Sequence, residues 1–263
     1  MKFYVIPPNK HLDMMHNGDS YFCLAHHFFN DKDYRNYFLN LRSIKPDAFI
    51  TLDNGAAEES LVTEEILLEA VKELQPNEVV APDVLFNKEQ TLVNFYSFIA
   101  KMKERGLINK TSIFACPQGS NRGEWLTCYK EMVLNEATSC IGLSKIAVPK
   151  CWNDATGDRL IATSRNECVL ELKQSNTILK PIHLLGMGEH TEFDFYLHNK
   201  IPNIRSSDSC YTVLAAKHGI SFAQGDTTRI PTDNSYFEGT LTNEQLALAV
   251  ENIQYLRQKY KEV

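Results

Sequence analysis

Short apolar or β-branched runs recur along this chain and alternate with stretches of helical periodicity. Eight runs are candidate strands: Phe22–Ala25, Ala48–Leu52, Glu78–Ala81, Ser112–Cys116, Cys140–Leu143, Ile182–Leu185, Asn203–Ser206 and Ile220–Ala223. Between them, segments such as Glu64–Leu74 place apolar residues at i, i+3, i+4 and i+7, the pattern of a helix that covers a sheet. Strand–helix alternation predicts parallel pairing.

This alternation favours an α/β fold of the (β/α)8 TIM-barrel type, with residues 1–263 forming a single domain. An open Rossmann-like sheet is the alternative, but no G-x-G-x-x-G follows any candidate strand. Two segments exceed a minimal barrel. One is a long connection between the fifth and sixth candidate strands, at 148–180, and the other is a C-terminal helix at 242–261 that opens with a capping-box pattern, Thr242 to Gln245.

The cellular setting is constrained by what the chain lacks. No apolar run approaches the roughly 18 to 20 residues of a membrane helix, and the first residues lack a signal-peptide core, so we expect a cytoplasmic protein with no membrane partner. The seven cysteines form no C-x-x-C pair, which favours reduced thiols. The net charge of −6 means that binding to nucleic acid would need a local basic patch.

Polar residues and glycines follow most of the candidate strands, where barrels of this type carry their catalytic groups. A single Asp after a strand is commonly a helix cap or a turn residue. Three of them, interleaved with glycines that let backbone approach a planar ligand, predict a shared cavity. The segments are Thr51–Ala56, Ala81–Asp83, Cys116–Gly119, Ile141–Ser144, Leu185–Gly188 and Ser206–Ser209.

Six motifs in this order resemble those of the tRNA-guanine transglycosylase family, over residues 48–215. Leu52–Ala56 resembles the family's T-D-S-G-G-F motif, with Ala56 and Ala57 in place of the second Gly and the aromatic. Asp83 matches its base-recognition Asp. The remaining matches are Pro117–Ser120 with V-Q-G-G, Ile141–Ser144 with G-G-L-A, Leu184–Gly188 with L-M-G-V-G, and Ser207–Cys210 with the nucleophile motif F-D-C.

The resemblance implies a pentosyltransferase that replaces guanine in nucleic acid by a 7-deazaguanine. Exchange with retention at an N-glycosidic bond calls for a carboxylate nucleophile and a covalent glycosyl intermediate, and Asp208 is the candidate. Asp53 is the candidate general acid/base, a role that favours a raised pKa. Because the target atom lies inside a base stack, the nucleotide must be flipped out or presented by a loop.

The resemblance also implies a binding site for the base. Asp83 would accept the N1–H and 2-amino hydrogens of a guanine-like ring. Gln118, with the backbone N–H of Gly142 or Leu143, would donate to the 6-oxo group. Leu185 and Met187, on either side of Gly186, would cover the ring faces or simply pack at the barrel mouth.

The zinc site of the tRNA-acting members, C-x-C-x-x-C and a later His, has no counterpart here, because Cys210 is the last cysteine. We therefore expect neither a metal nor a cofactor. The short form resembles the DNA-modifying branch of bacteriophages and bacterial islands, which inserts 7-cyano-7-deazaguanine (preQ0) for anti-restriction protection. DNA is thus favoured over tRNA as the partner, in the host-cell cytoplasm if a phage encodes the protein. Candidates for phosphate contacts, or merely solvated rim charges, are Arg205, Arg122, Lys145 and Lys150.

Two other functions remain open. The chain could be a catalytically silent nucleic-acid-binding subunit of a transglycosylase, although its three aspartates together argue against that. It could also be a carboxylate-based or metal-dependent barrel hydrolase of small molecules. A metal at His26 or His27, or a sugar-shaped cleft lined by Trp125 and Trp152, would favour the hydrolase.

Overall fold

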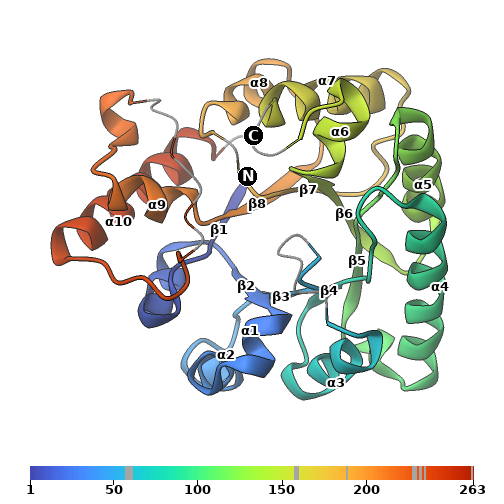
Figure 1. Cartoon of the computed structure of the whole chain (residues 1–263), viewed down its shortest axis with the longest axis horizontal. Coiled ribbons are helices and arrows are strands. Elements are labelled where there is room, and N and C mark those ends of the chain that lie inside the picture. The colour runs from blue at the N-terminus through green and yellow to red at the C-terminus, as the bar shows by residue number, and fades with distance from the viewer. Residues whose placement is uncertain are drawn as a thin grey trace.

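A computed structural model of the chain describes residues 1–56, 62–156, 160–187, 189–226, 230, 233, 235–261 and 263. Within them, eight parallel strands form one sheet in the order β1-β8-β7-β6-β5-β4-β3-β2, curled around a common centre with helices outside (Figure 1). A bridge between Tyr4 and Ser20 brings the two sheet edges together. The predicted single-domain (β/α)8 barrel is confirmed.

The strands are short, and each is buried at all of its residues or at all but one. Their bounds are β1 (Lys2–Val5), β2 (Tyr21–Leu24), β3 (Ile50–Asp53), β4 (Glu78–Val80), β5 (Ser112–Ala115), β6 (Thr138–Ser144), β7 (Ile182–Leu185) and β8 (Ile204–Ser209). Continuous apolar runs are typical of parallel strands covered on both faces.

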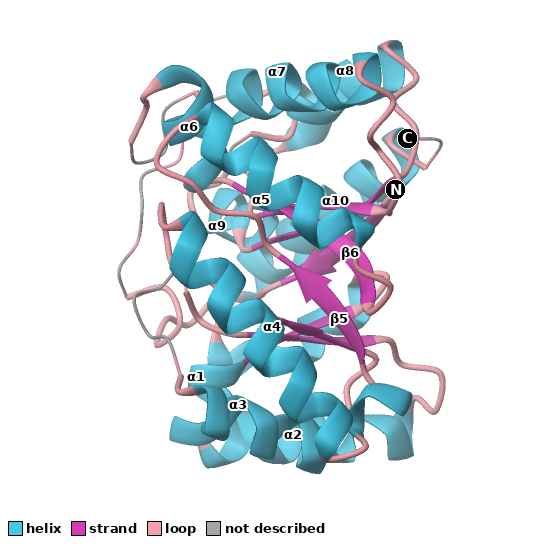
Figure 2. Ribbon diagram, turned by 90° about the vertical axis from the view of Figure 1, so that its right-hand side faces the viewer, coloured by secondary structure: helices cyan, strands magenta, loops and turns pink. Residues whose placement is uncertain are grey.

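Helices surround the sheet, with α4 and α5 side by side on one flank (Figure 2). Their bounds are α1 (Ala25–Asn30), α2 (Lys32–Ile44), α3 (Glu64–Leu74), α4 (Lys88–Glu104), α5 (Arg122–Leu134), α6 (Ala147–Asn153), α7 (Ile161–Gln174), α8 (Glu192–His198), α9 (Tyr211–Lys217) and α10 (Asn243–Lys259), and short 3-10 helices cover Asn9–Asn17, Leu107–Asn109 and Phe222–Gln224. No helix in the described ranges is both long and apolar enough to cross a lipid bilayer.

Seven of the candidate strands are present, and the eighth was misplaced. Ile220–Ala223 is not a strand: Phe222 begins a 3-10 helix, its ring stacks on Tyr211, and its N–H donates to the Asn252 side chain. The eighth strand is instead β1, which pairs with β8 in parallel. A short buried apolar run reads alike in either conformation, so periodicity alone could not separate the two.

The two predicted additions to the barrel are helical. The 148–180 connection holds most of α6 and all of α7, while residues 157–159 within it lie outside the described residues. The terminal helix α10 begins after Thr242, whose side chain accepts the Gln245 N–H while the Gln245 side chain accepts the Thr242 N–H. The predicted capping box is therefore confirmed.

Two β-bulges in the sheet direct polar side chains toward Glu78, at the amino-terminal end of the barrel. On β6, Ile113 pairs with Thr138 but Phe114 with Cys140, so Ser139 is an extra residue, and Arg205 is likewise extra on β8. Bulges re-aim side chains. Ser139 donates to Glu78 at 2.9 Å, and Arg205 binds both Glu78 oxygens at 2.7 and 2.9 Å.

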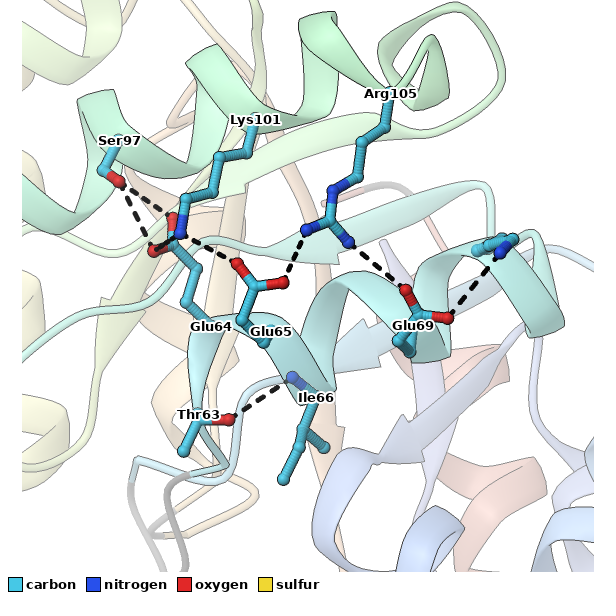
Figure 3. Close-up of polar contacts among 9 residues, drawn as sticks. Thr63, Glu64, Glu65, Ile66, Glu69, Ser97, Lys101 and Arg105 are labelled. Atoms are coloured by element: carbon cyan, nitrogen blue, oxygen red, sulfur yellow. Dashed lines mark hydrogen bonds and ion pairs between the residues drawn. The ribbon is translucent and has the colours of Figure 1, made fainter.

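The outer helices α3 and α4 are joined by a charged network (Figure 3). Thr63 caps α3, and the acids in its first turn suit the positive helix end. Lys101 lies 2.9 Å from both Glu64 and Glu65, and Arg105 reaches Glu65 at 2.5 Å. Such partly exposed pairs contribute little individually, about 0 to 1 kcal/mol.

Candidate active site

A cleft of about 970 Å³ opens where the strands end, and the three predicted aspartates line it together. Asp53 is the last residue of β3, Asp83 follows β4, and Asp208 is next to last in β8. Their side chains come from strands far apart in the sequence and are 8%, 4% and 6% exposed. The parallel topology brings them together, because all strands end at the same barrel mouth.

Asp208 is held by donors on one of its oxygens. Oδ1 accepts the N–H of Gly186 at 3.0 Å and lies 2.8 Å from Nε2 of His183, a fully buried side chain. Neither contact was predicted from the sequence. Within the described residues, Oδ2 of Asp208 accepts no hydrogen bond, so that oxygen can face a substrate.

Asp53 lines the same cleft from β3, which is separated from β8 by β1 and β2 around the barrel. Its Oδ2 accepts the N–H of Gly55 at 2.8 Å, a local turn that fixes the carboxylate direction. A buried carboxylate with a backbone donor, in a cleft that holds other carboxylates, can exchange a proton with a bound molecule.

Asp83 sits in a buried amide clamp. Oδ1 accepts an N–H of Asn54 at 2.7 Å, and Oδ2 accepts an N–H of Gln118 at 2.5 Å. Burial nevertheless dominates and raises the pKa of Asp83 to about 6, against the lowering effect of both amides. Each carboxylate oxygen can accept more than one hydrogen, so the clamp leaves acceptor capacity for a ligand.

Gln118 is placed differently from its expected role. Its Nε2 donates to Asp83 and lies 3.6 Å from the Cys116 sulfur, while its Oε1 accepts the Phe86 N–H at 3.2 Å. With these contacts the amide supports Asp83 rather than offering a donor to a 6-oxo group. Asn54, directly after β3, also donates to Asp83 and supports it. The sequence indicated Asn54 only as part of the Leu52–Ala56 motif.

The segment 185–187 forms one wall of the cleft, as expected for Leu185, Gly186 and Met187. Gly186 has a φ of 68° and packs so closely on Lys145 that a Cβ would lie 2.6 Å from its Cδ, so glycine is required there. Beneath the wall, the buried Arg165 donates to the carbonyls of residues 143, 185 and 186 and pairs with Glu192 at 2.6 Å.

The expected backbone donors on β6 need correction. Gly142 and Leu143 lie inside the paired part of β6, opposite His183 and Leu184, and the cleft wall begins one residue later at Ser144. Gly142 has a packing role instead: a Cβ there would lie 2.6 Å from both the Phe114 ring and Leu185.

Gly142→Ala is expected to lower the free energy of unfolding by about 1 to 3 kcal/mol, because the added methyl group overpacks a closed barrel interior. Urea denaturation would measure the change. Gly123→Ala, in the exposed first turn of α5 with only one contact at 3.4 Å, should instead leave stability equal or slightly higher. Equal behaviour of the two variants would contradict this role for Gly142.

The four basic candidates are scattered. Lys145 lines the cleft. Arg122 pairs with Glu171 on the outer helices, and Lys150 pairs with Asp154. Arg205 was wrongly placed at this rim: the bulge on β8 turns it to the opposite end of the barrel, where it binds Glu78. Among the described residues, Lys145 is thus the one of these four that lines the cleft.

The residues that would have favoured a hydrolase are not arranged for one. Trp125 is fully buried, stacked on Tyr129 and in edge contact with Trp152, so it forms no sugar platform. His26 and His27 lie together on α1, and burial lowers the pKa of His26 to about 4. In the part of the chain that the structure describes, no three His, Cys, Asp or Glu side chains are grouped to hold a metal ion.

Comparisons with known proteins do not show a family for this chain. No family model matches the sequence, and no curated protein does. Among solved structures, an enolase protein from environmental shotgun sequencing of the Sargasso Sea is similar with a TM-score of 0.46 and 11% identity, over 80% of this chain and 54% of that one, so this chain spans about half its length. An Anabaena variabilis protein described as a sugar phosphate isomerase/epimerase gives 0.38 and 14%, over 88% and 80%.

Proposed function

We propose that this protein is a pentosyltransferase that exchanges guanine in DNA for a 7-deazaguanine such as 7-cyano-7-deazaguanine. The observation that carries the proposal is the gathering of Asp53, Asp83 and Asp208 on one cleft. These are the three carboxylates that the motif resemblance assigns to proton transfer, base recognition and nucleophilic attack. A hydrolase or a binding subunit does not need all three in one place.

The reaction divides into two displacements at the sugar C1′. Oδ2 of Asp208 forms a bond to C1′ while the bond to N9 of guanine breaks, and the departing base keeps that electron pair and takes a proton from Asp53. The incoming deazaguanine then loses the proton of its corresponding ring nitrogen to Asp53. That nitrogen bonds to C1′ and releases Asp208 as a carboxylate, so configuration is retained.

Base recognition falls to Asp83. The guanine edge carries two neighbouring donors, N1–H and the 2-amino group, which one ionised carboxylate accepts together. The clamp of Asn54 and Gln118 fixes the orientation of that carboxylate in a buried wall of the cleft. Leu185 and Met187 supply apolar surface beside it, suited to a flat ring.

Binding of the nucleic-acid partner is proposed to depend little on positive charge. Lys145 gives the cleft one cationic side chain, whereas the chain as a whole carries a net charge of −6. Contacts to an extruded nucleotide in the cleft, rather than a broad basic surface, would therefore dominate binding. The choice of DNA over tRNA rests on the short, zinc-less form of the sequence.

The direct test is base exchange in vitro. The protein is incubated with DNA carrying labelled guanine, and separately with tRNA, each with and without 7-cyano-7-deazaguanine, and label release is measured. We expect release from DNA that depends on the added base. Release from tRNA alone would reassign the partner, and no release from either would refute the proposed function.

The pKa of Asp83 gives the exchange a pH dependence. Base binding needs the ionised carboxylate, so KM for 7-cyano-7-deazaguanine should rise as the pH falls through about 6, roughly tenfold per unit below it. Because the pKa of Asp83 in the folded protein lies above the usual 3.8, Asp83 lowers the free energy of unfolding as the pH rises from 3.8 to about 6. Asp83→Asn should raise KM above about pH 6 and abolish its pH dependence, and a constant KM in the native protein would contradict the assignment.

A further inference from the structure

A continuous line of polar side chains runs through the barrel core and ends on Asp208. Arg205 binds Glu78 at the amino-terminal end, and its Nε donates to the Ser206 hydroxyl oxygen at 3.2 Å. Ser206 lies 2.7 Å from Nδ1 of His183, and Nε2 of His183 lies 2.8 Å from Asp208. Ser206 and His183 are fully buried, so this line is shielded from solvent.

The direction of the hydrogen bonds is set by the arginine. A guanidinium can only donate, so the Ser206 oxygen accepts from Arg205 and its own proton is free to point to His183. Nδ1 of His183 is then the acceptor, and in a neutral imidazole the proton must sit on Nε2, facing Asp208. The reverse tautomer would set the bare Nε2 lone pair against the Asp208 carboxylate at 2.8 Å.

The surroundings of His183 favour its neutral form. Its ring stacks on Phe22 and meets Tyr4 and Phe114 edge-on. The charged or titratable groups that act on it are Asp208 and Glu78, which raise its pKa, and Arg205, which lowers it, while burial is the largest effect and leaves the pKa below its usual value. Burial also raises the pKa of the Tyr4 hydroxyl, with Arg205 and Ser206 acting in the opposite direction.

We propose that Arg205, Ser206 and His183 form a one-way hydrogen-bond relay that fixes the His183 proton on Nε2 and thereby positions Asp208 for attack. The inference rests on the proposed function in naming Asp208 the nucleophile. With His183 and Gly186 both donating to Oδ1, the carboxylate cannot rotate, and Oδ2 keeps its full nucleophilic character. All three relay members are positioning residues, since none of them lines the cleft within the described residues.

The proton arrangement can be observed without any substrate. In ¹⁵N-histidine-labelled protein, proton–nitrogen correlations of the imidazole rings distinguish protonated from bare nitrogens, and His183→Gln identifies the signals by their loss. We expect Nε2 protonated and Nδ1 bare but hydrogen-bonded. A protonated Nδ1, in either the other tautomer or an imidazolium, would overturn the relay.

Ser206→Ala breaks the relay with the loss of one hydroxyl, and Ser207→Ala is its matched control. Ser207 is the next residue on β8, is equally buried and donates to the Leu184 carbonyl instead of to His183. Ser206→Ala should move the Nδ1 signal toward that of an unbonded nitrogen and lower kcat roughly 10-fold with little change in KM. Ser207→Ala should change neither, and identical results for both variants would overturn the proposal.

A second pair of variants separates positioning from packing. His183→Gln keeps an N–H donor near Asp208, whereas His183→Leu keeps only volume, so the glutamine variant should retain at least about 10-fold more exchange activity. Equal loss would overturn a hydrogen-bonding role. The spectra and the exchange assay fail independently: active protein with a protonated Nδ1 refutes the relay alone, and inactive protein with the expected spectrum refutes the proposed function alone.

Discussion

Replacing Asp208 by asparagine is expected to abolish base exchange, with kcat reduced at least about a thousandfold. Asparagine has nearly the same shape and keeps an oxygen that can accept from His183 and Gly186, so the wall around it should persist. It lacks the charge needed to form a glycosyl ester. Label release from guanine-labelled DNA measures the loss, and mass spectrometry of acid-quenched mixtures should show a protein–DNA adduct only with the native residue.

Asp47→Asn is the matched control for that experiment. Asp47 is an exposed carboxylate that precedes β3, so it lies before the amino-terminal end of that strand, whereas the carboxyl-terminal end lines the cleft. This variant should exchange bases at the native rate, which excludes a general effect of lost charge. Undiminished release by Asp208→Asn would remove the nucleophile assignment.

Arg165→Met is expected to cost about 3 to 5 kcal/mol of unfolding free energy, because it leaves the Glu192 charge buried without its partner. Both side chains of this pair are fully buried. The same change removes a hydrogen bond from each of the carbonyls at residues 185 and 186, so the cleft wall should loosen as well. Guanidinium denaturation measures the stability change, and exchange activity should fall in parallel at temperatures where the variant is still folded.

Two further variants test the cause of that loss. Adding Glu192→Gln removes the stranded charge while keeping an acceptor for the Tyr196 hydroxyl, so the double variant should recover part of the stability. Arg35→Met breaks the exposed pair with Glu73, whose side chains are 42% and 34% exposed, and should cost less than about 1 kcal/mol. If Arg165→Met cost no more than Arg35→Met, the buried pair would have no special structural role.

The sequence was sufficient for the architecture and for the acidic residues of the cleft. Strand–helix alternation is a repeating signal, and parallel strands bring their ends to one mouth, so Asp53, Asp83 and Asp208 could be grouped without coordinates. Helix α3 was predicted with its observed bounds from its apolar spacing, and the structure adds that Thr63 caps it. The strand at Lys2–Val5 was missed because a short buried run at the terminus has no flanking helical pattern.

The side-chain placements that could not be predicted depend on the register between neighbouring strands. Nothing in the sequence marks Arg205 as an extra residue in β8, so its side chain was assigned to the wrong end of the barrel. His183 lies inside an apolar run and reads as core, yet it contacts Asp208. Gly142 looked like a point of close approach to a ligand, whereas it makes room for Phe114 and Leu185.

The buried cluster of Glu78, Ser139 and Arg205 also bears on the route by which molecules reach the cleft. It occupies the amino-terminal end, and in the interior between it and the cleft the His183 ring contacts both Tyr4 and Phe114. A substrate nucleotide, an outgoing base and its replacement would therefore share the open side of the cleft as an entrance and use it in turn. Any molecule that covered that entrance would arrest all three movements together.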